Sequence, residues 1–151
     1  MSTQLASQYL TFAVNNQDFG IEILRVQEIK NFSRVTPIPN MPACVKGVMN
    51  LRGTVVPIVD LRSKFSMPFA EYDQFTVIIV VNVGGRVMGL VVDAVSDVLD
   101  INQDAIENPP NMGGADTSFI MGLAKSGDQI VTLLNIEQLL ADQSASLSVA
   151  V

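Results

Sequence analysis

The chain has 151 residues, 48% of them hydrophobic, with 9 Lys and Arg against 15 Asp and Glu and a net charge of −6. This length suits one domain with its own core, and the acidic balance argues against nucleic acid or an acidic membrane surface as the main ligand. There is no histidine, so the commonest general base and metal ligand are absent, and the single cysteine, Cys44, excludes an intrachain disulfide. Most familiar enzyme designs therefore do not suit this chain, and we expect a cytoplasmic protein without a catalytic residue, metal or cofactor.

From residue 9 onward, short β-branched runs separated by Gly, Asn and Pro dominate, which is typical of an all-β fold. The N-terminal residues before them lack a basic region followed by a sustained apolar run, so no signal peptide is expected. We expect strands within 9–29, a loop-rich bridge around 37–42, and a hairpin that ends at Asp60. Pro57 lies inside the last of these strands and cannot donate to a ladder, so this strand is expected to be an edge or to bulge.

The second half of the chain repeats the order of the first. Residues 19–29 align without a gap with residues 88–98, and residues 45–61 align with residues 120–136. Apolar and glycine positions coincide in both alignments, which makes chance similarity of Val-rich strands a poor explanation. Because closure removes exposed edges, a unit of about five short strands is best closed into a barrel.

The repeat therefore predicts two five-stranded β-barrels packed side by side, with short helical turns and a short C-terminal helix. Asp60 and Asn135 occupy equivalent positions and are expected to be N-caps, because a short side-chain oxygen can accept from the first free N–H groups of a helical turn. We expect a single domain over 8–141, with the first barrel at about 15–70, the second at about 76–136, terminal segments completing them, and a flexible tail over 142–151.

The two copies differ at a few positions, and such differences are candidates for function. The acid of the first motif is present in both copies, as Glu28 and Asp97, whereas Arg52 aligns with Gly127. Two interpretations of Arg52 stay open. It is either a solvated turn residue before Gly53, or an arginine at the cleft between the barrels, within reach of an acid such as Glu28.

Apolar side chains precede both acids. Ile23 and Val26 in the first copy, and Val95 and Val98 in the second, are each expected to lie in the core on the burial preference of their residue type. Ile21, Ile23, Val26 and Ile29 of the first copy do not lie on one period-2 face, however. Some of these side chains should therefore point outward, where exposed aliphatic residues mark an interaction site.

The acidic residues of the segment 93–104 suggest an alternative class of function. Asp93, Asp97, Asp100 and Asp104 could serve an enzyme or a small-ligand domain, but the spacing of an EF-hand is missing and the chain has no Trp. A solvated face is the better interpretation of these four carboxylates.

Three segments together resemble the CheW family of bacterial chemotaxis coupling proteins. They are FGIEILRVQEIKNFSRVTPIPNMP, VKGVMNLRGTVVPIVDLRSKF and MGLVVDAVSDVLDI, and the resemblance extends from about Tyr9 to Leu140. It implies two SH3-like five-stranded barrels around a shared apolar seam, which agrees with the internal repeat.

The resemblance also implies a function, that of a non-enzymatic adaptor. Such a protein couples transmembrane chemoreceptors, the methyl-accepting chemotaxis proteins, to a CheA-type histidine kinase in signalling arrays. The implied partners are the regulatory domain of the kinase, the cytoplasmic tip of the receptors and other copies of the chain in array rings. The chain would be cytoplasmic and recruited to the inner face of the membrane through the receptors. The alternative is a CheW-like scaffold in a non-flagellar pathway of pilus motility or development.

The family's contact residues can be carried over position by position. The implied receptor-binding residues are Val26, Glu28, Arg52, Val95 and Val98. The implied kinase-binding residues are Leu10, Ile23, Val26, Glu107 and Met112. At the last two positions better-known members have a basic and an aromatic residue nearby, so this chain would need a matching change in its kinase.

Overall fold

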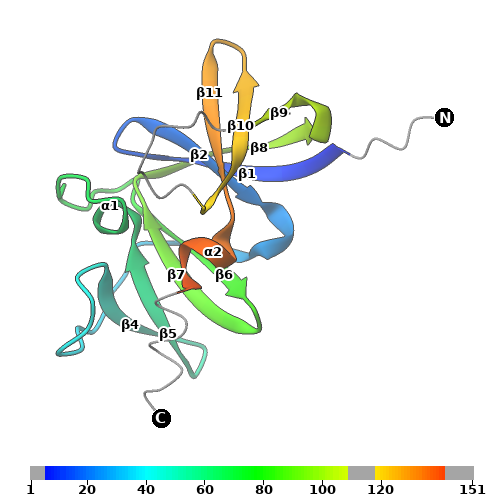
Figure 1. The fold of residues 1–151 in the computed structure, drawn as a ribbon. Coiled ribbons are helices and arrows are strands. Elements are labelled where there is room, and N and C mark those ends of the chain that lie inside the picture. Colours follow the sequence, from blue (N-terminus) through cyan, green and yellow to red (C-terminus); the bar gives the residue numbers. More distant parts are fainter. Residues whose placement is uncertain (1–5, 109–117, 142–151) are drawn as a thin grey trace.

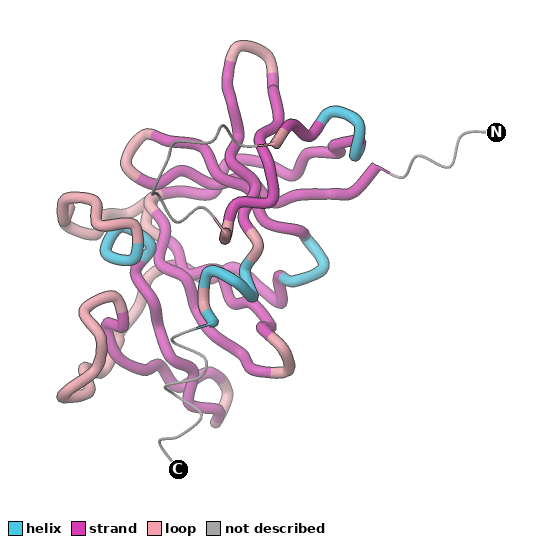
Figure 2. Tube along the Cα trace, viewed as in Figure 1, coloured by secondary structure: helices cyan, strands magenta, loops and turns pink. Residues whose placement is uncertain are grey.

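The structure, a computed structural model, describes residues 6–108 and 118–141 and consists mainly of short strands (Figures 1 and 2). The strands are β1 (Ala6–Val14), β2 (Gln17–Glu22), β3 (Val26–Asn31), β4 (Val45–Leu51), β5 (Thr54–Asp60), β6 (Val77–Val83), β7 (Arg86–Val92), β8 (Ala94–Asn102), β9 (Ile106–Glu107), β10 (Ile120–Ser126) and β11 (Gln129–Leu134). Among the described residues there are also four helical turns: η1 (Ile23–Arg25), α1 (Leu61–Lys64) and η2 (Gln103–Ala105) between strands, and α2 (Ile136–Leu139) after the last strand. The predicted all-β class is confirmed, and the expected tail over 142–151 lies outside the described residues.

The strands form two sheets. Sheet A has the order β8–β1–β2–β11–β10–β9, and sheet B has the order β3–β6–β7–β5–β4. Each sheet contains one parallel contact, β2 with β11 in sheet A and β7 with β5 in sheet B. Within the described part of the chain, no helix is both long and apolar enough to cross a bilayer.

The two copies of the repeat exchange their first hairpins. The hairpin β1–β2 of the first copy joins the second copy's strands in sheet A, while β6–β7 of the second copy joins the first copy's strands in sheet B. The division into units over 15–70 and 76–136 was expected to keep each hairpin with its own copy, and the sheets differ from it because β2 lies in sheet A and β6–β7 lie in sheet B. A parallel neighbour needs a long crossover connection, so the partner of β2 comes from far along the chain, and an alignment of the copies does not reveal it.

Three apolar clusters explain why several strands are apolar on both faces. The largest takes residues from both sheets and from α1 and α2, so it forms the shared seam between them. A second lies within sheet B and a third within sheet A. In β6, Ile79 faces the seam while Ile78 faces the cluster of sheet B, which accounts for the continuous apolar run 77–81. The predicted shared seam is confirmed.

Pro57 occupies a position where a proline costs little. Its ladder partner on β4 is Val48, whose N–H and C=O both bond to Thr36, so the pair Val48–Pro57 exchanges no hydrogen bonds. On the other side, the register with β7 begins only at Ile58. This half of β5 therefore behaves as a local edge, as the proline predicted.

Both predicted N-caps are confirmed. The Asp60 carboxylate accepts from the N–H of Arg62 at the start of α1, and the Asn135 side chain accepts from the N–H of Gln138 in α2. The same two positions of the repeat thus end a strand and begin a helical turn in each copy.

Candidate functional site

The predicted receptor-binding residues lie on two edge strands and one hairpin turn. β3 is an edge of sheet B and carries Val26 and Glu28, whereas β8 is an edge of sheet A and carries Val95 and Val98. Val26 and Val95 are half-buried and pack against the shared seam. Val98 is 42% exposed, which makes it one of the few large apolar side chains open to solvent.

Arg52 contacts Glu28 from the turn between β4 and β5. One terminal nitrogen of the guanidinium lies 3.4 Å from Oε1 of Glu28, and the other donates to Oε2, so the pair is two-pronged. The hydrogen bond from Arg52 lowers the pKa of Glu28, and the carboxylate raises the pKa of Arg52. The predicted contact between Arg52 and an acid is therefore present.

This ion pair joins opposite edges of one sheet. β3 and β4 are the two outer strands of sheet B, yet Glu28 of β3 reaches the turn that follows β4. Sheet B must therefore curl until its edges approach each other. Because this ion pair links the two outer strands of sheet B, we call Arg52 and Glu28 the edge clasp.

The backbone at Arg52 is unusual for an arginine. Among the described residues, four hairpins have two-residue turns, and three of these turns begin with Asn15, Gly84 or Gly127 at a positive φ. The fourth begins with Arg52 at φ 49°, a region that side-chain-bearing residues other than Asn and Asp rarely occupy. The Asn50 side chain accepts from the Gly53 N–H at 2.7 Å and supports this turn.

The second copy has no equivalent of the edge clasp. Asp97, the counterpart of Glu28, accepts from the N–H of Val98 at 2.8 Å, and its backbone exchanges two hydrogen bonds with the Thr11 hydroxyl. The counterpart of Arg52 is Gly127, which has no side chain to offer. The two edges therefore present different chemistry although the repeat makes them equivalent in position.

The predicted kinase-binding residues of the first copy have different accessibility. Leu10 is only 2% exposed and belongs to the shared seam, so its side chain packs in the core beneath the protein surface. Ile23, in η1, is half-buried against the same seam. Its neighbour Leu24 is 92% exposed, and the sequence prediction missed it. Ile23 and Val26 were both expected in the core, and both do face the seam. An apolar residue between two such positions has to point away from the core, and this spacing could have indicated that Leu24 is exposed.

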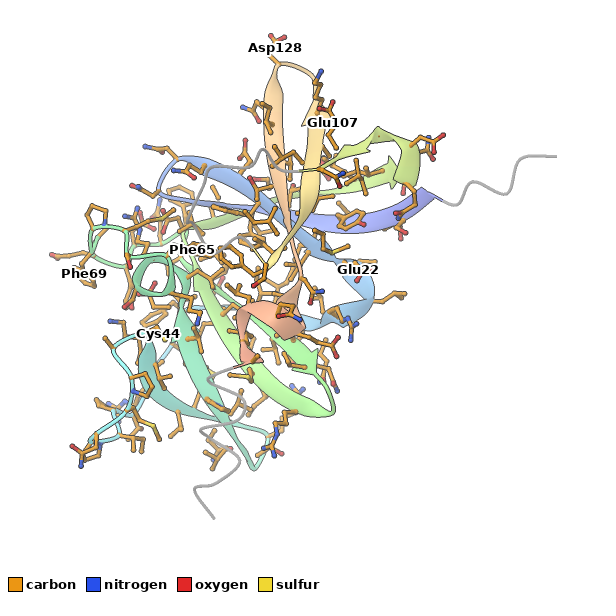
Figure 3. The ribbon with its side chains drawn as sticks, in the orientation of Figure 1. Glu22, Cys44, Phe65, Phe69, Glu107 and Asp128 are labelled. Carbon is orange, nitrogen blue, oxygen red and sulfur yellow. The ribbon has the colours of Figure 1, made fainter. Side chains whose placement is uncertain are left out.

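The remaining predicted kinase residues lie apart from this region. Glu107 is on β9, at the opposite edge of sheet A from β8, and it pairs with Lys125 at 3.7 Å. Figure 3 shows Glu107 beside β9 and β10, away from Glu22, which precedes η1. Met112 lies outside the described residues.

The acidic segment 93–104 does not gather its carboxylates at one point. Asp93 binds Arg62 of α1 through two hydrogen bonds of 2.9 and 2.7 Å and also accepts from the Asn15 N–H. Asp97 bonds its own strand, as described above. Over 6–108 and 118–141, no group of three or more His, Cys, Asp or Glu side chains is placed to hold a metal ion.

Comparison with known proteins identifies related chains. A family model described as a CheW-like domain matches residues 8–144. A chemotaxis protein CheW of Klebsiella aerogenes is 43% identical over 144 residues, covering 95% of this chain and 87% of the relative. Another, of Rhizobium meliloti, is 38% identical over 131 residues, covering 86% and 84%. The solved structure of the scaffolding protein TtCheW from Thermoanaerobacter tengcongensis matches with a TM-score of 0.83 and 31% identity, covering 90% of this chain and 93% of that one.

Proposed function

The chain belongs to the CheW family, and on this premise we propose that it is a non-enzymatic adaptor that couples chemoreceptors to a CheA-type histidine kinase. In this role it holds the cytoplasmic tip of the receptor and the regulatory domain of the kinase at the same time. It is cytoplasmic and reaches the membrane through the receptor. The observation that carries the proposal is the family match over residues 8–144. That span includes the edge strands β3 and β8 and the edge clasp between Arg52 and Glu28.

The receptor side of the proposal uses the two edge strands. A helical hairpin tip can place apolar side chains against Val95 and the exposed Val98, as amphipathic helices do in apolar grooves. Arg52 supplies the polar contact. The edge clasp uses two of the five N–H donors of its guanidinium, and the side chain remains 70% exposed, so its other donors can meet a polar group at the rim.

The kinase side uses the first copy around η1. Leu24 presents a nearly fully exposed aliphatic side chain, and Ile23 and Val26 lie beside it in the chain with partial exposure. Arg25 of the same turn is held by Glu137 of α2 at 3.3 Å, which ties the turn to the C-terminal helix. Exposed apolar side chains that gather on one anchored turn are typical of a protein interaction site.

A pair of binding experiments tests the proposal. The purified chain should capture both the kinase regulatory domain and a receptor-tip fragment from the same organism. Arg52→Gly leaves a residue suited to the turn but removes the guanidinium, and Val98→Asp places a charge on the β8 edge. Each should weaken receptor capture by about tenfold while kinase capture is retained.

Leu24→Asp is the reciprocal variant, and it should weaken kinase capture by about tenfold and spare the receptor. Because Leu24 is 92% exposed, this change tests the surface without disturbing the core. Ile23→Asp, in contrast, would place a charge against the core. Ile130→Asp is the matched control, since Ile130 is 57% exposed on β11 and outside both proposed surfaces. The proposal fails if the wild-type chain captures neither partner, or if the control behaves like the other variants.

A further inference from the structure

Most cationic side chains of this chain are used internally, and a few are not. All 9 lysines and arginines lie in the described residues. Arg25, Arg52, Arg62 and Lys125 form ion pairs with Glu137, Glu28, Asp93 and Glu107. Lys30 acts electrostatically on Glu28, and Lys64 is also engaged. Among the residues that the structure describes, Arg34, Lys46 and Arg86 are left without an acidic partner.

Two of these three cations line one pocket. It has a volume of about 460 Å³, its lining residues include no carboxylate, and we call it the cationic pocket. It is lined by Phe32, Ser33, Arg34, Val35, Lys46 and Tyr72. Arg86 lies in a different, apolar groove. In a chain with a net charge of −6, two unpaired cations at one pocket are a local reversal of sign.

The backbone that carries Arg34 is fixed at both ends. The N–H of Phe32 donates to the carbonyl of Thr76 at 3.1 Å, and Thr36 exchanges two hydrogen bonds of 2.8 and 2.9 Å with Val48. Val48 follows Lys46 by two residues on β4, so the two cations stand on segments tied directly to each other. Holding them in place beforehand lowers the entropic cost of binding an anion.

Gly47 makes this close attachment possible. A Cβ atom added at Gly47, which has φ 145°, would lie 2.0 Å from the carbonyl oxygen of Thr36. Only glycine therefore lets the crossing segment 32–36 lie this close to β4. The fold therefore fixes the backbone positions from which Arg34 and Lys46 reach the cationic pocket.

One wall of the pocket is aromatic. The rings of Phe32 and Tyr72 have centroids 4.2 Å apart, and the Tyr72 hydroxyl donates to Asp60 at 2.7 Å, which fixes the ring. Such a wall accepts an aromatic or aliphatic side chain beside the anionic groups that Arg34 and Lys46 attract.

We propose that the cationic pocket binds an acidic segment of a partner protein. Carboxylates of the segment pair with Arg34 and Lys46, and an adjacent apolar side chain packs on Phe32 and Tyr72. The net charge of −6 disfavours extended polyanions such as nucleic acid, whereas a short acidic segment meets mainly the local charge. The pocket shares no residue with the proposed receptor and kinase surfaces, so this inference stands apart from the proposed function.

Titration with a defined probe tests the inference. The probe is a short blocked peptide of alternating glutamate and phenylalanine, and binding to the full chain is followed by amide chemical shifts. We expect the largest shifts over 32–35 and at Lys46, with an affinity that falls as salt is added. Arg34→Glu and Lys46→Glu should each weaken binding at least about tenfold, and Arg34→Gln and Lys46→Gln serve if a reversed charge harms folding.

Arg86→Glu is the matched control, because it makes the same charge change at the third unpaired cation and should leave binding intact. Equal weakening by Arg86→Glu would mean that only net charge matters, and would overturn the inference. Equal binding of a peptide with glutamine for glutamate would overturn it too, as would inorganic phosphate that competes at the same concentration. Failure of the probe to bind, or occupation of the pocket by a second copy of the chain, would count against it equally.

Discussion

Arg52 sits where local backbone preference and side-chain chemistry disagree. Its φ of 49° belongs to the left-handed region, which costs a residue with a Cβ roughly 1–2 kcal/mol relative to the right-handed one. The other two-residue turns avoid that cost at their first position with Asn or Gly. The edge clasp with Glu28 gives a physical reason for the exception, because the arginine at this turn contacts the opposite edge of sheet B with two nitrogens, which Asn or Gly at this position could not do.

A second ion pair predicts how stability depends on pH. Burial raises the pKa of Asp93, but hydrogen bonds from Arg62 and the Asn15 N–H outweigh it and leave that pKa below its ordinary value. The unfolded chain then takes up the proton at a higher pH than the folded chain. The stabilisation is complete above the ordinary pKa, about 4, and is lost as the pH falls through the lower folded value.

Urea unfolding between pH 6 and pH 3 measures this effect. The free energy of unfolding should fall more steeply with decreasing pH in the wild-type chain than in Asp93→Asn, which has no proton to take up there. Arg62→Gln removes the partner of Asp93 and should flatten the curve in the same way. Parallel curves for Asp93→Asn and the wild type would show that the pair with Arg62 does not stabilise the fold.

Among the elements, the crossing segment 32–36 is hydrogen-bonded to β4 at Val48, and Gly47 allows the close approach. Gly47→Ala places a methyl group against the Thr36 carbonyl and should destabilise the chain by more than about 3 kcal/mol, or prevent folding. Gly53→Ala is the matched control. It also has a positive φ, 88°, but open space around the added methyl, so backbone strain alone should cost about 1 kcal/mol. Chemical denaturation compares the two, and equal losses would show that the segment does not press on β4.

At the scale of the whole molecule, the exchanged hairpins predict a single cooperative unit. Neither sheet can unfold alone, because each contains strands from both copies of the repeat and both pack on one seam. Calorimetry should therefore show one transition with equal calorimetric and van't Hoff enthalpies. Leu133→Ala inside sheet A and Ile58→Ala inside sheet B should each shift that whole transition, by about 2–5 kcal/mol of stability. Two resolved transitions would contradict this.

The sequence predicted the features that repeat or that local chemistry determines. The duplication indicated two packed units of short strands, and the family resemblance implied the shared seam between them. The Asp60 and Asn135 positions indicated helix caps, and the difference between the copies singled out Arg52. The exchange of hairpins could not be predicted, because parallel pairing between β2 and β11 leaves no local pattern. Exposure of Leu24 and the joint position of Arg34 and Lys46 depend on how distant segments pack. Those features required the structure.

The proposed coupling of a receptor to a kinase can be measured by reconstitution. The measurement is the autophosphorylation rate of the organism's CheA-type kinase with membrane-embedded receptors, in the presence and absence of the chain. We expect the receptors to change the rate only when the chain is present, and Arg52→Gly to lose most of that effect although the protein remains folded. The proposed coupling would be contradicted if the kinase rate responded to receptors equally well without the chain, or if adding the chain never changed that rate.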